Sequence, residues 1–72
     1  MKKINKIKIK VNGKLINIQE KTSLSSLIKK LNIPLKKVAI ELNQTIVNKK
    51  SLGKIKVKKN NKIEIVNFIG GG

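Results

Sequence analysis

The chain of 72 residues contains no cysteine, no histidine and no arginine, and Phe68 is its single aromatic residue. Without cysteine the chain forms no disulfide and has no thiol nucleophile. Its three acidic residues, Glu20, Glu41 and Glu64, are too few to favour a metal site or a pair of catalytic carboxylates. No side chain lies beside a base that would activate it as a nucleophile. These absences argue against an enzyme, and we expect the chain itself to bind no metal and no cofactor.

Long apolar runs are missing as well. Met1-Lys2-Lys3 has the charge of a signal-peptide start, but the apolar residues that follow alternate with lysine. No stretch approaches the roughly 20 consecutive apolar residues of a membrane helix. We therefore expect no membrane partner, and a location in the cytoplasm, or in the stroma if a plastid encodes the protein.

The charge is almost entirely of one sign, because 18 lysines face three acids and give a net charge of +15. Such a charge attracts phosphate and raises the alternative of a small basic nucleic-acid-binding module. Arginine and stacking aromatic rings, the usual readers of bases, are lacking or nearly so. Lysine, isoleucine and asparagine are over-used together, and their A- and T-rich codons explain the charge by compositional drift. Specific nucleic-acid binding is therefore disfavoured.

The first part of the chain predicts a β-hairpin. Residues 4–11 alternate between apolar side chains and lysine, as in a strand with one solvated face. Asn12-Gly13 follows, and this pair suits a type I′ turn because both positions need a positive φ. A two-residue loop determines the register, so the predicted cross-strand pairs are Val11 with Lys14, Ile9 with Ile16, and Ile7 with Ile18.

A helix is predicted next, with Thr22 or Ser23 as its N-cap. It ends near Asn32 and Pro34, two residues that are typical of helix termini. Its apolar residues recur at helical spacing and are expected to pack on the sheet; they are Leu24, Leu27, Ile28 and Leu31.

Further strands are expected after the helix, with an irregular or single 3₁₀ turn before the last one. The predicted segments are strands at 38–42, 45–47 and 63–68, and the turn at 48–54. Ile55 and Val57 should tuck under the sheet. Ile63 and Ile65 should face the helix, which places Val66 and Phe68 on the opposite face. The order predicts an α+β fold in which one helix crosses one face of a mixed sheet of four to five strands.

Three glycines, Gly70, Gly71 and Gly72, follow the last strand. A glycine run has almost no steric profile, so it can enter a slot that side chains would block. Its one reactive group is the α-carboxylate of Gly72, which is ionised at neutral pH. We therefore expect one domain over residues 1–69 and a flexible tail over residues 70–72, with the terminal carboxylate as the working group.

Four stretches together resemble the ubiquitin-like β-grasp sulfur carriers, and among them the ThiS type of thiamine biosynthesis. These stretches are Val11-Asn12-Gly13, Thr22-Ser23-Leu24, 38–47 and 63–72. The resemblance implies the β-grasp fold and a protein co-substrate rather than a catalyst. It implies that a ThiF-type adenylating enzyme, using ATP and Mg²⁺, activates Gly72. A cysteine desulfurase or another persulfide donor then supplies sulfur, and the resulting Gly72 thiocarboxylate donates it to thiazole synthase.

The resemblance also assigns roles near the tail. Gly70 and Gly71 would be the slender stem, while Ile69, Phe68 and Val66 would dock on partners. The turn that usually reads Gly-Asp in such carriers is Asn60-Asn61 here, and asparagine tolerates the left-handed conformation that this turn needs. Molybdopterin synthesis, tRNA thiolation and ubiquitin-like protein modification remain alternative destinations, although the short gap between Leu31 and Val38 favours the thiamine carrier.

Overall fold

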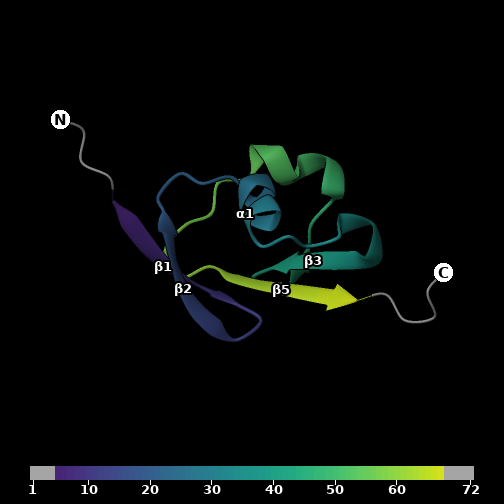
Figure 1. Ribbon diagram of the computed structural model, residues 1–72, viewed down its shortest axis with the longest axis horizontal. Helices are drawn as coiled ribbons and strands as arrows, with labels where there is room; N and C mark the ends of the chain where they lie inside the picture. The colour runs from purple at the N-terminus through teal and green to yellow at the C-terminus, as the bar shows by residue number, and fades with distance from the viewer. Residues whose placement is uncertain (1–4, 68–72) are drawn as a thin grey trace.

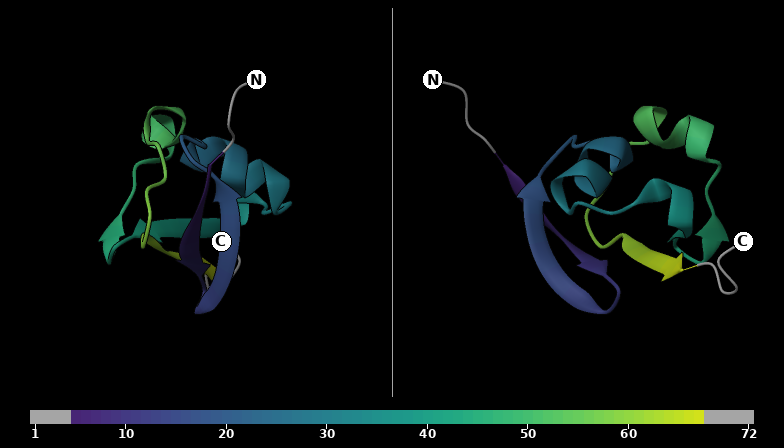
Figure 2. Two further views of the ribbon diagram at one scale, coloured as in Figure 1. Left: turned by 90° about the vertical axis from the view of Figure 1, so that its left-hand side faces the viewer. Right: turned by 45° about the vertical axis from the view of Figure 1, so that its right-hand side comes forward.

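A mixed sheet in the order β2-β1-β5-β3-β4 forms one layer of the computed structural model, which describes residues 5–67. The two neighbours β1 and β5 run parallel, and the remaining pairs are antiparallel. The elements are β1 (Lys6–Val11), β2 (Lys14–Gln19), α1 (Leu24–Lys30), η1 (Leu35–Lys37), β3 (Val38–Leu42), β4 (Thr45–Ile46), η2 (Lys49–Lys54) and β5 (Lys62–Asn67). Figures 1 and 2 show α1 and η2 together on one side of the sheet. The predicted β-grasp architecture is confirmed.

The hairpin has the predicted register. Ile7 pairs with Ile18, Ile9 with Ile16, and Val11 with Lys14. Asn12 has a φ of 49° and Gly13 a φ of 83°, so both turn residues adopt the left-handed conformation that a type I′ turn requires. The local turn chemistry and the apolar alternation therefore lead to the same pairing.

The helix begins at Ser23, whose hydroxyl oxygen accepts a hydrogen bond from the Ser26 amide at 3.0 Å. Thr22 instead donates its hydroxyl to the Gln19 carbonyl at 2.6 Å, so Ser23 is the N-cap of the two candidates. The helix ends at Lys30, one residue before the last residue of its apolar pattern. Leu31 is the C-cap and is 39% exposed, so its predicted place in the core is wrong. Asn32 follows directly and has a φ of 55°, so the chain changes direction just after Leu31.

The second half follows the predicted order with small shifts of the boundaries. β4 is Thr45–Ile46 and excludes Val47, although the Val47 amide still donates to the Ile40 carbonyl at 2.9 Å. Val57 is buried as expected, and its amide donates to Thr22 at the helix entry. The described part of the last strand ends at Asn67, so the predicted strand residue Phe68 lies outside the described residues.

The core is a single apolar layer between the sheet and the helix. Its most enclosed side chains come from both layers; they are Ile9, Leu24, Leu27, Val38, Ile40, Val57 and Ile63. No polar or charged residue within 5–67 is buried. Among the same residues, no helix is long and apolar enough to cross a membrane. The helix covers one side of the sheet, and the opposite side is left open.

Ile40 and Ile46 allow a direct test of which side chains form the core. They lie on the paired strands β3 and β4, and their exposed fractions differ widely. Ile40 is completely buried and Ile46 is 70% exposed. Ile40→Val should lower the free energy of unfolding by about 0.5–1.5 kcal/mol, since it removes one buried methylene. Ile46→Val should change it by less than about 0.5 kcal/mol. Urea denaturation of both variants measures the difference, and equal losses would contradict the assigned burial.

Candidate functional site

The C-terminal segment follows a strand that lies inside the sheet. β5 lies between β1 and β3 and ends at Asn67. Figure 1 shows β5 running toward the C-terminus, away from the start of β1. The predicted site residues that follow lie outside the described residues; they are Phe68, Ile69, Gly70, Gly71 and Gly72. What the structure describes is the support from which this segment starts.

Val66 lies on the open face of the sheet, as expected from its position in the strand. It is 45% exposed, whereas Ile63 is buried and Ile65 packs against the core from the helix-facing side. Register places Val66 opposite Ala39. Ile46, 70% exposed, belongs to the same face on β4. Apolar side chains therefore flank the start of the C-terminal segment on the side that the helix does not cover.

Two of the three acidic residues belong to this surface, because Glu41 and Glu64 lie directly opposite each other on β3 and β5. We call the set Ala39, Glu41, Ile46, Glu64 and Val66 the open-face patch. Like charges directly opposite in a sheet are destabilising. A cation from a binding partner would offset this repulsion, so the patch suits a partner surface that combines apolar groups with a basic residue.

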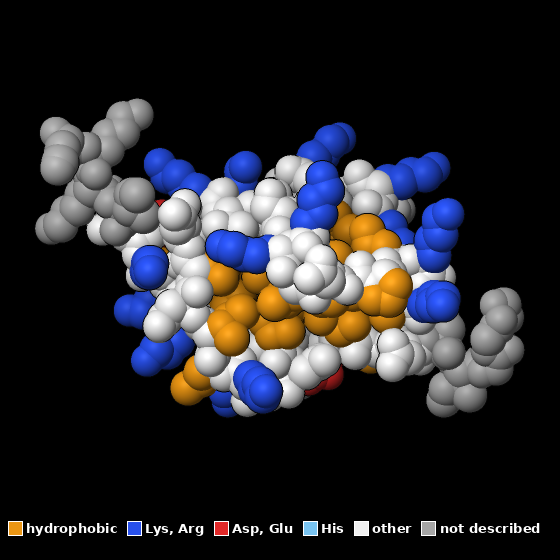
Figure 3. Space-filling model, in the orientation of Figure 1, with side chains coloured by type: hydrophobic (Ala, Val, Ile, Leu, Met, Phe, Trp, Pro, Cys, Tyr) orange, Lys and Arg blue, Asp and Glu red, His pale blue; other side chains and the backbone are white. Residues whose placement is uncertain are grey.

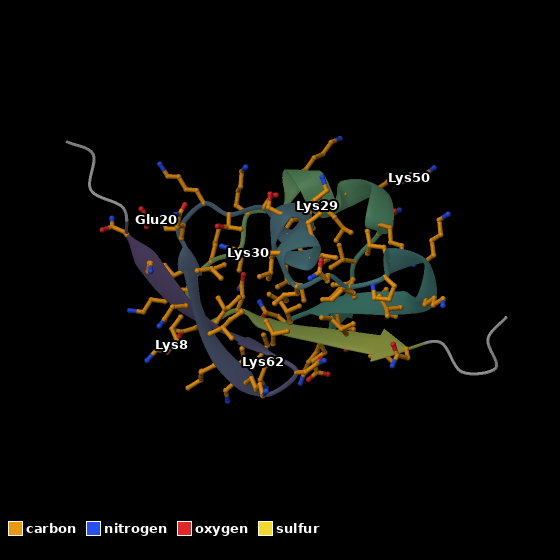
Figure 4. The ribbon with its side chains drawn as sticks, viewed as in Figure 1. Lys8, Glu20, Lys29, Lys30, Lys50 and Lys62 are labelled. Atoms are coloured by element: carbon orange, nitrogen blue, oxygen red, sulfur yellow. The ribbon has the colours of Figure 1, made fainter. Side chains whose placement is uncertain are left out.

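The lysines are spread over most elements, and four of them line one groove beside the helix entry; they are Lys21, Lys29, Lys30 and Lys56. Figure 4 labels lysines on β1 (Lys8), α1 (Lys29 and Lys30), η2 (Lys50) and β5 (Lys62), and their side chains leave the body in different directions. Figure 3 likewise shows blue side chains around the whole outline of the described part. A nucleic-acid site normally concentrates its charge on one face or along one groove. Outside this groove the lysines are spread over most elements, as compositional drift predicts.

Asn12 has a role that the sequence pattern did not indicate. Its side-chain Oδ1 accepts a hydrogen bond from the Ile65 amide at 2.7 Å, and its own amide donates to the Ile63 carbonyl at 2.9 Å. The hairpin turn is thereby tied to β5 shortly before the C-terminal segment. Aspartate or glycine at this position would also form the turn. The presence of asparagine was therefore the one sequence signal that its side chain makes a further contact.

Other asparagines hold the entry to β5. Asn43 Oδ1 accepts from the Lys62 amide at 2.9 Å, and Asn61 Oδ1 accepts from the Lys58 amide at 2.7 Å. Asn60 has a φ of 69°, so the Asn60-Asn61 turn forms as expected despite lacking glycine. Within residues 5–67 there is no group of three potential metal-binding side chains.

These features define a class: a small ubiquitin-like β-grasp protein, with a parallel central strand pair and glycines at its C-terminus. The particular family follows from the sequence match. The model of the ThiS family matches residues 4–72, and the chain belongs to this family.

The fold comparison agrees with this assignment. The crystal structure of the thiamine biosynthesis protein ThiS from Geobacter metallireducens is similar over 92% of this chain and 100% of its own, with a TM-score of 0.82 and 26% identity. The uncharacterized protein ycf40 of Porphyra purpurea is 34% identical over 96% of this chain and 99% of its own length.

Two curated relatives are much longer proteins. Thiazole synthases of Magnetococcus marinus and Paramagnetospirillum magneticum are 36% and 38% identical to this chain over 66 residues. The match covers 92% of this chain and 20% of each relative, so the chain spans about one fifth of their length.

The Asn12 contact predicts a selective effect on β5. Asn12→Gly keeps the positive φ but removes the acceptor, so the Ile65 amide should exchange faster with solvent and stability should fall by about 1 kcal/mol. Asn12→Asp keeps an acceptor oxygen at the same place and serves as the matched control. Amide exchange followed by NMR measures the effect, and identical Ile65 rates in the two variants would refute the contact.

Proposed function

We propose that this chain carries sulfur as a thiocarboxylate on Gly72 and delivers it to thiazole synthase. The observation that carries the proposal is the ThiS family match, which extends through Gly72. The β-grasp body supports it, because its strand β5 leads from the middle of the sheet directly to this segment.

The chemistry begins with activation of a poor electrophile. An oxygen of the Gly72 carboxylate attacks the α-phosphate of ATP in a ThiF-type adenylating enzyme, and pyrophosphate leaves. Mg²⁺ on that enzyme would neutralise the phosphate charge. The terminal sulfur of a persulfide, supplied by a cysteine desulfurase or another donor, then attacks the acyl carbon and displaces AMP. A thiol cleaves the resulting acyl disulfide, which releases the thiocarboxylate as a sulfur nucleophile.

Thiazole synthase is the proposed acceptor because of the two long relatives. In each of them, a protein named thiazole synthase contains a segment that is similar to nearly this whole chain. Two functions joined in one polypeptide act at high effective concentration, which suits a carrier and its acceptor. This relation favours the thiamine route over molybdopterin synthesis, tRNA thiolation or protein modification.

The chain acts in this scheme as a co-substrate, and the catalytic groups belong to its partners. Gly70 and Gly71 form the stem that enters a partner's channel, and Phe68 and Ile69 anchor the base of the stem. The open-face patch, which includes Val66, docks on the same partners. The location in cytoplasm or stroma stays a prediction.

Removal of Gly72 tests the carrier function directly. The shortened chain should keep its fold but lose thiocarboxylate formation, because its new terminus no longer reaches the α-phosphate of ATP. Gly71→Ala should lower the rate strongly, since a methyl group obstructs a slot built for glycine. Intact mass spectrometry after incubation with ATP, a sulfur source and the adenylating enzyme detects exchange of one terminal oxygen for sulfur.

Gly53→Ala serves as the control, because a Cβ at this position meets no atom within 4 Å. It should form thiocarboxylate at the wild-type rate. Undiminished sulfur loading of the chain that lacks Gly72 would refute the proposed function.

The docking role of Val66 has its own test. Val66→Lys places a charge in the open-face patch, and it should raise the KM of the adenylating enzyme for the carrier about tenfold or more, as for an interface anchor. Leu15→Lys is the matched control, because Leu15 is 60% exposed on β2 outside the patch. It should leave KM within about twofold. Equal KM values for the two variants would exclude Val66 from the interface.

A further inference from the structure

β5 extends beyond the end of its neighbour β1. The parallel pairing consists of Lys10 with Lys62 and Val11 with Ile63, after which β1 enters the hairpin turn. On the other side, β3 accompanies β5 as far as Asn67. In Figure 1 the last part of β5 accordingly runs past the hairpin, with β3 above it in this view. The final residues of β5 therefore have a strand on one side only.

The hydrogen bonds show which backbone groups face the vacant side. Lys62 is bonded toward β3, since its carbonyl accepts from the Asn43 amide at 2.7 Å. Ile63 and Ile65 are bonded toward the hairpin, to the amide and the side chain of Asn12. Bonding direction alternates along a strand. The Ile65 carbonyl and the Asn67 amide thus point to the side that β1 has left.

No backbone hydrogen bond among residues 5–67 reaches these two groups from that side. Unpaired strand edges are templates for pairing with another chain. The last hydrogen bond between the hairpin and β5 joins the Asn12 side chain to the Ile65 amide. The unpaired edge begins after this bond. It is therefore short and lies immediately before the C-terminal segment.

A groove accompanies this edge on the helix-facing side. Its volume is about 510 Å³. It is lined from β5, the hairpin and the segment after α1, by residues that include Val11, Lys14, Leu31, Ile33, Ile65 and Asn67. Figure 3 shows apolar side chains gathered in a band on this face, between α1 and β5. The exposure of Leu31, which the helix pattern alone places in the core, provides part of this apolar wall.

We infer that this edge and groove receive an extended strand of the adenylating enzyme, which continues the sheet in the place that β1 leaves vacant. The occupant would accept a hydrogen bond from the Asn67 amide and donate one to the Ile65 carbonyl. Strand addition of this kind gains affinity from the main chain and specificity from side-chain pockets.

The groove also indicates the side chains of this strand. Leu31 and Ile33 provide apolar contacts, so an apolar side chain faces them. Lys14 is the charged residue of the lining, in a chain of net charge +15, and a carboxylate of the partner complements it. The inference rests on the proposed function, because the partner is the enzyme that must align Gly72 with ATP. Pairing at Asn67 would direct the glycine stem into that enzyme.

Asn67→Pro tests the edge with little disturbance of the fold. Asn67 faces Val38 at a position that does not exchange ladder hydrogen bonds, because those bonds belong to the alternate residues of β5. Proline therefore removes only the outward amide, and it is tolerated on strand edges. The KM for the carrier in ATP–pyrophosphate exchange should rise about tenfold. Asn67→Ala keeps the amide and should stay within about twofold of wild type.

A second pair of variants tests the groove. Leu31→Glu introduces a carboxylate that repels the acidic strand, and it should raise KM. Leu15→Glu should not, because Leu15 lies on the opposite face of the sheet and is not part of the groove lining. A third measurement needs no turnover. In the ¹⁵N-labelled carrier, the Asn67 amide should exchange about tenfold more slowly when the adenylating enzyme is added in saturating amount.

The outcomes separate this inference from the proposed function. Normal KM values for Asn67→Pro and Leu31→Glu, with unchanged Asn67 exchange, would overturn the strand addition while thiocarboxylate formation on Gly72 still supports the carrier. Protection of Asn67 that depends on carrier concentration alone would assign the edge to a second copy of this chain and overturn the inference as well. A wild-type chain that the enzyme never adenylates would refute the proposed function itself.

Discussion

The parallel pairing of β1 with β5 is the constraint on which the arrangement depends. Parallel strands cannot be joined by a tight turn, so the chain between them must cross the sheet. That crossing contains α1, which covers one face and completes the core. The same pairing places β5 inside the sheet, and the C-terminal segment therefore starts from the best-supported strand. Because β1 ends first, it also leaves the last residues of β5 open on one side.

The size of the body explains why its chemistry has to lie at the chain end. A domain of about 70 residues buries only about 60% of its unfolded surface, and here that burial is one apolar layer. Such a layer leaves no room for an enclosed catalytic site. In the proposed function the chain overcomes this limit by presenting one reactive terminus to larger enzymes. The body then needs only two properties, a rigid support for the terminus and surfaces that identify the partner.

Two surfaces, the open-face patch and the groove beside β5, differ from the lysine-rich remainder of the molecule. Lysines on most elements give the described part of the molecule a positive surface, which attracts polyanions without selecting among them. The open-face patch differs, because Glu41 and Glu64 meet there beside Val66 and Ile46. The groove beside β5 differs in another way, because its lining is mainly apolar. Both lie next to the start of the C-terminal segment, where recognition and delivery of the carboxylate must coincide.

Local sequence determined the hairpin, the helix entry and the order of strands. Asn12-Gly13 dictates its turn through positive φ, and alternating side chains define the two faces of each strand. The tertiary structure alone decided that Leu31 is exposed, that Glu41 meets Glu64, and that Asn12 binds Ile65, 53 residues away. The reason is physical. Turn preference and periodicity act over a few residues, whereas contacts between distant strands depend on which register buries the core best.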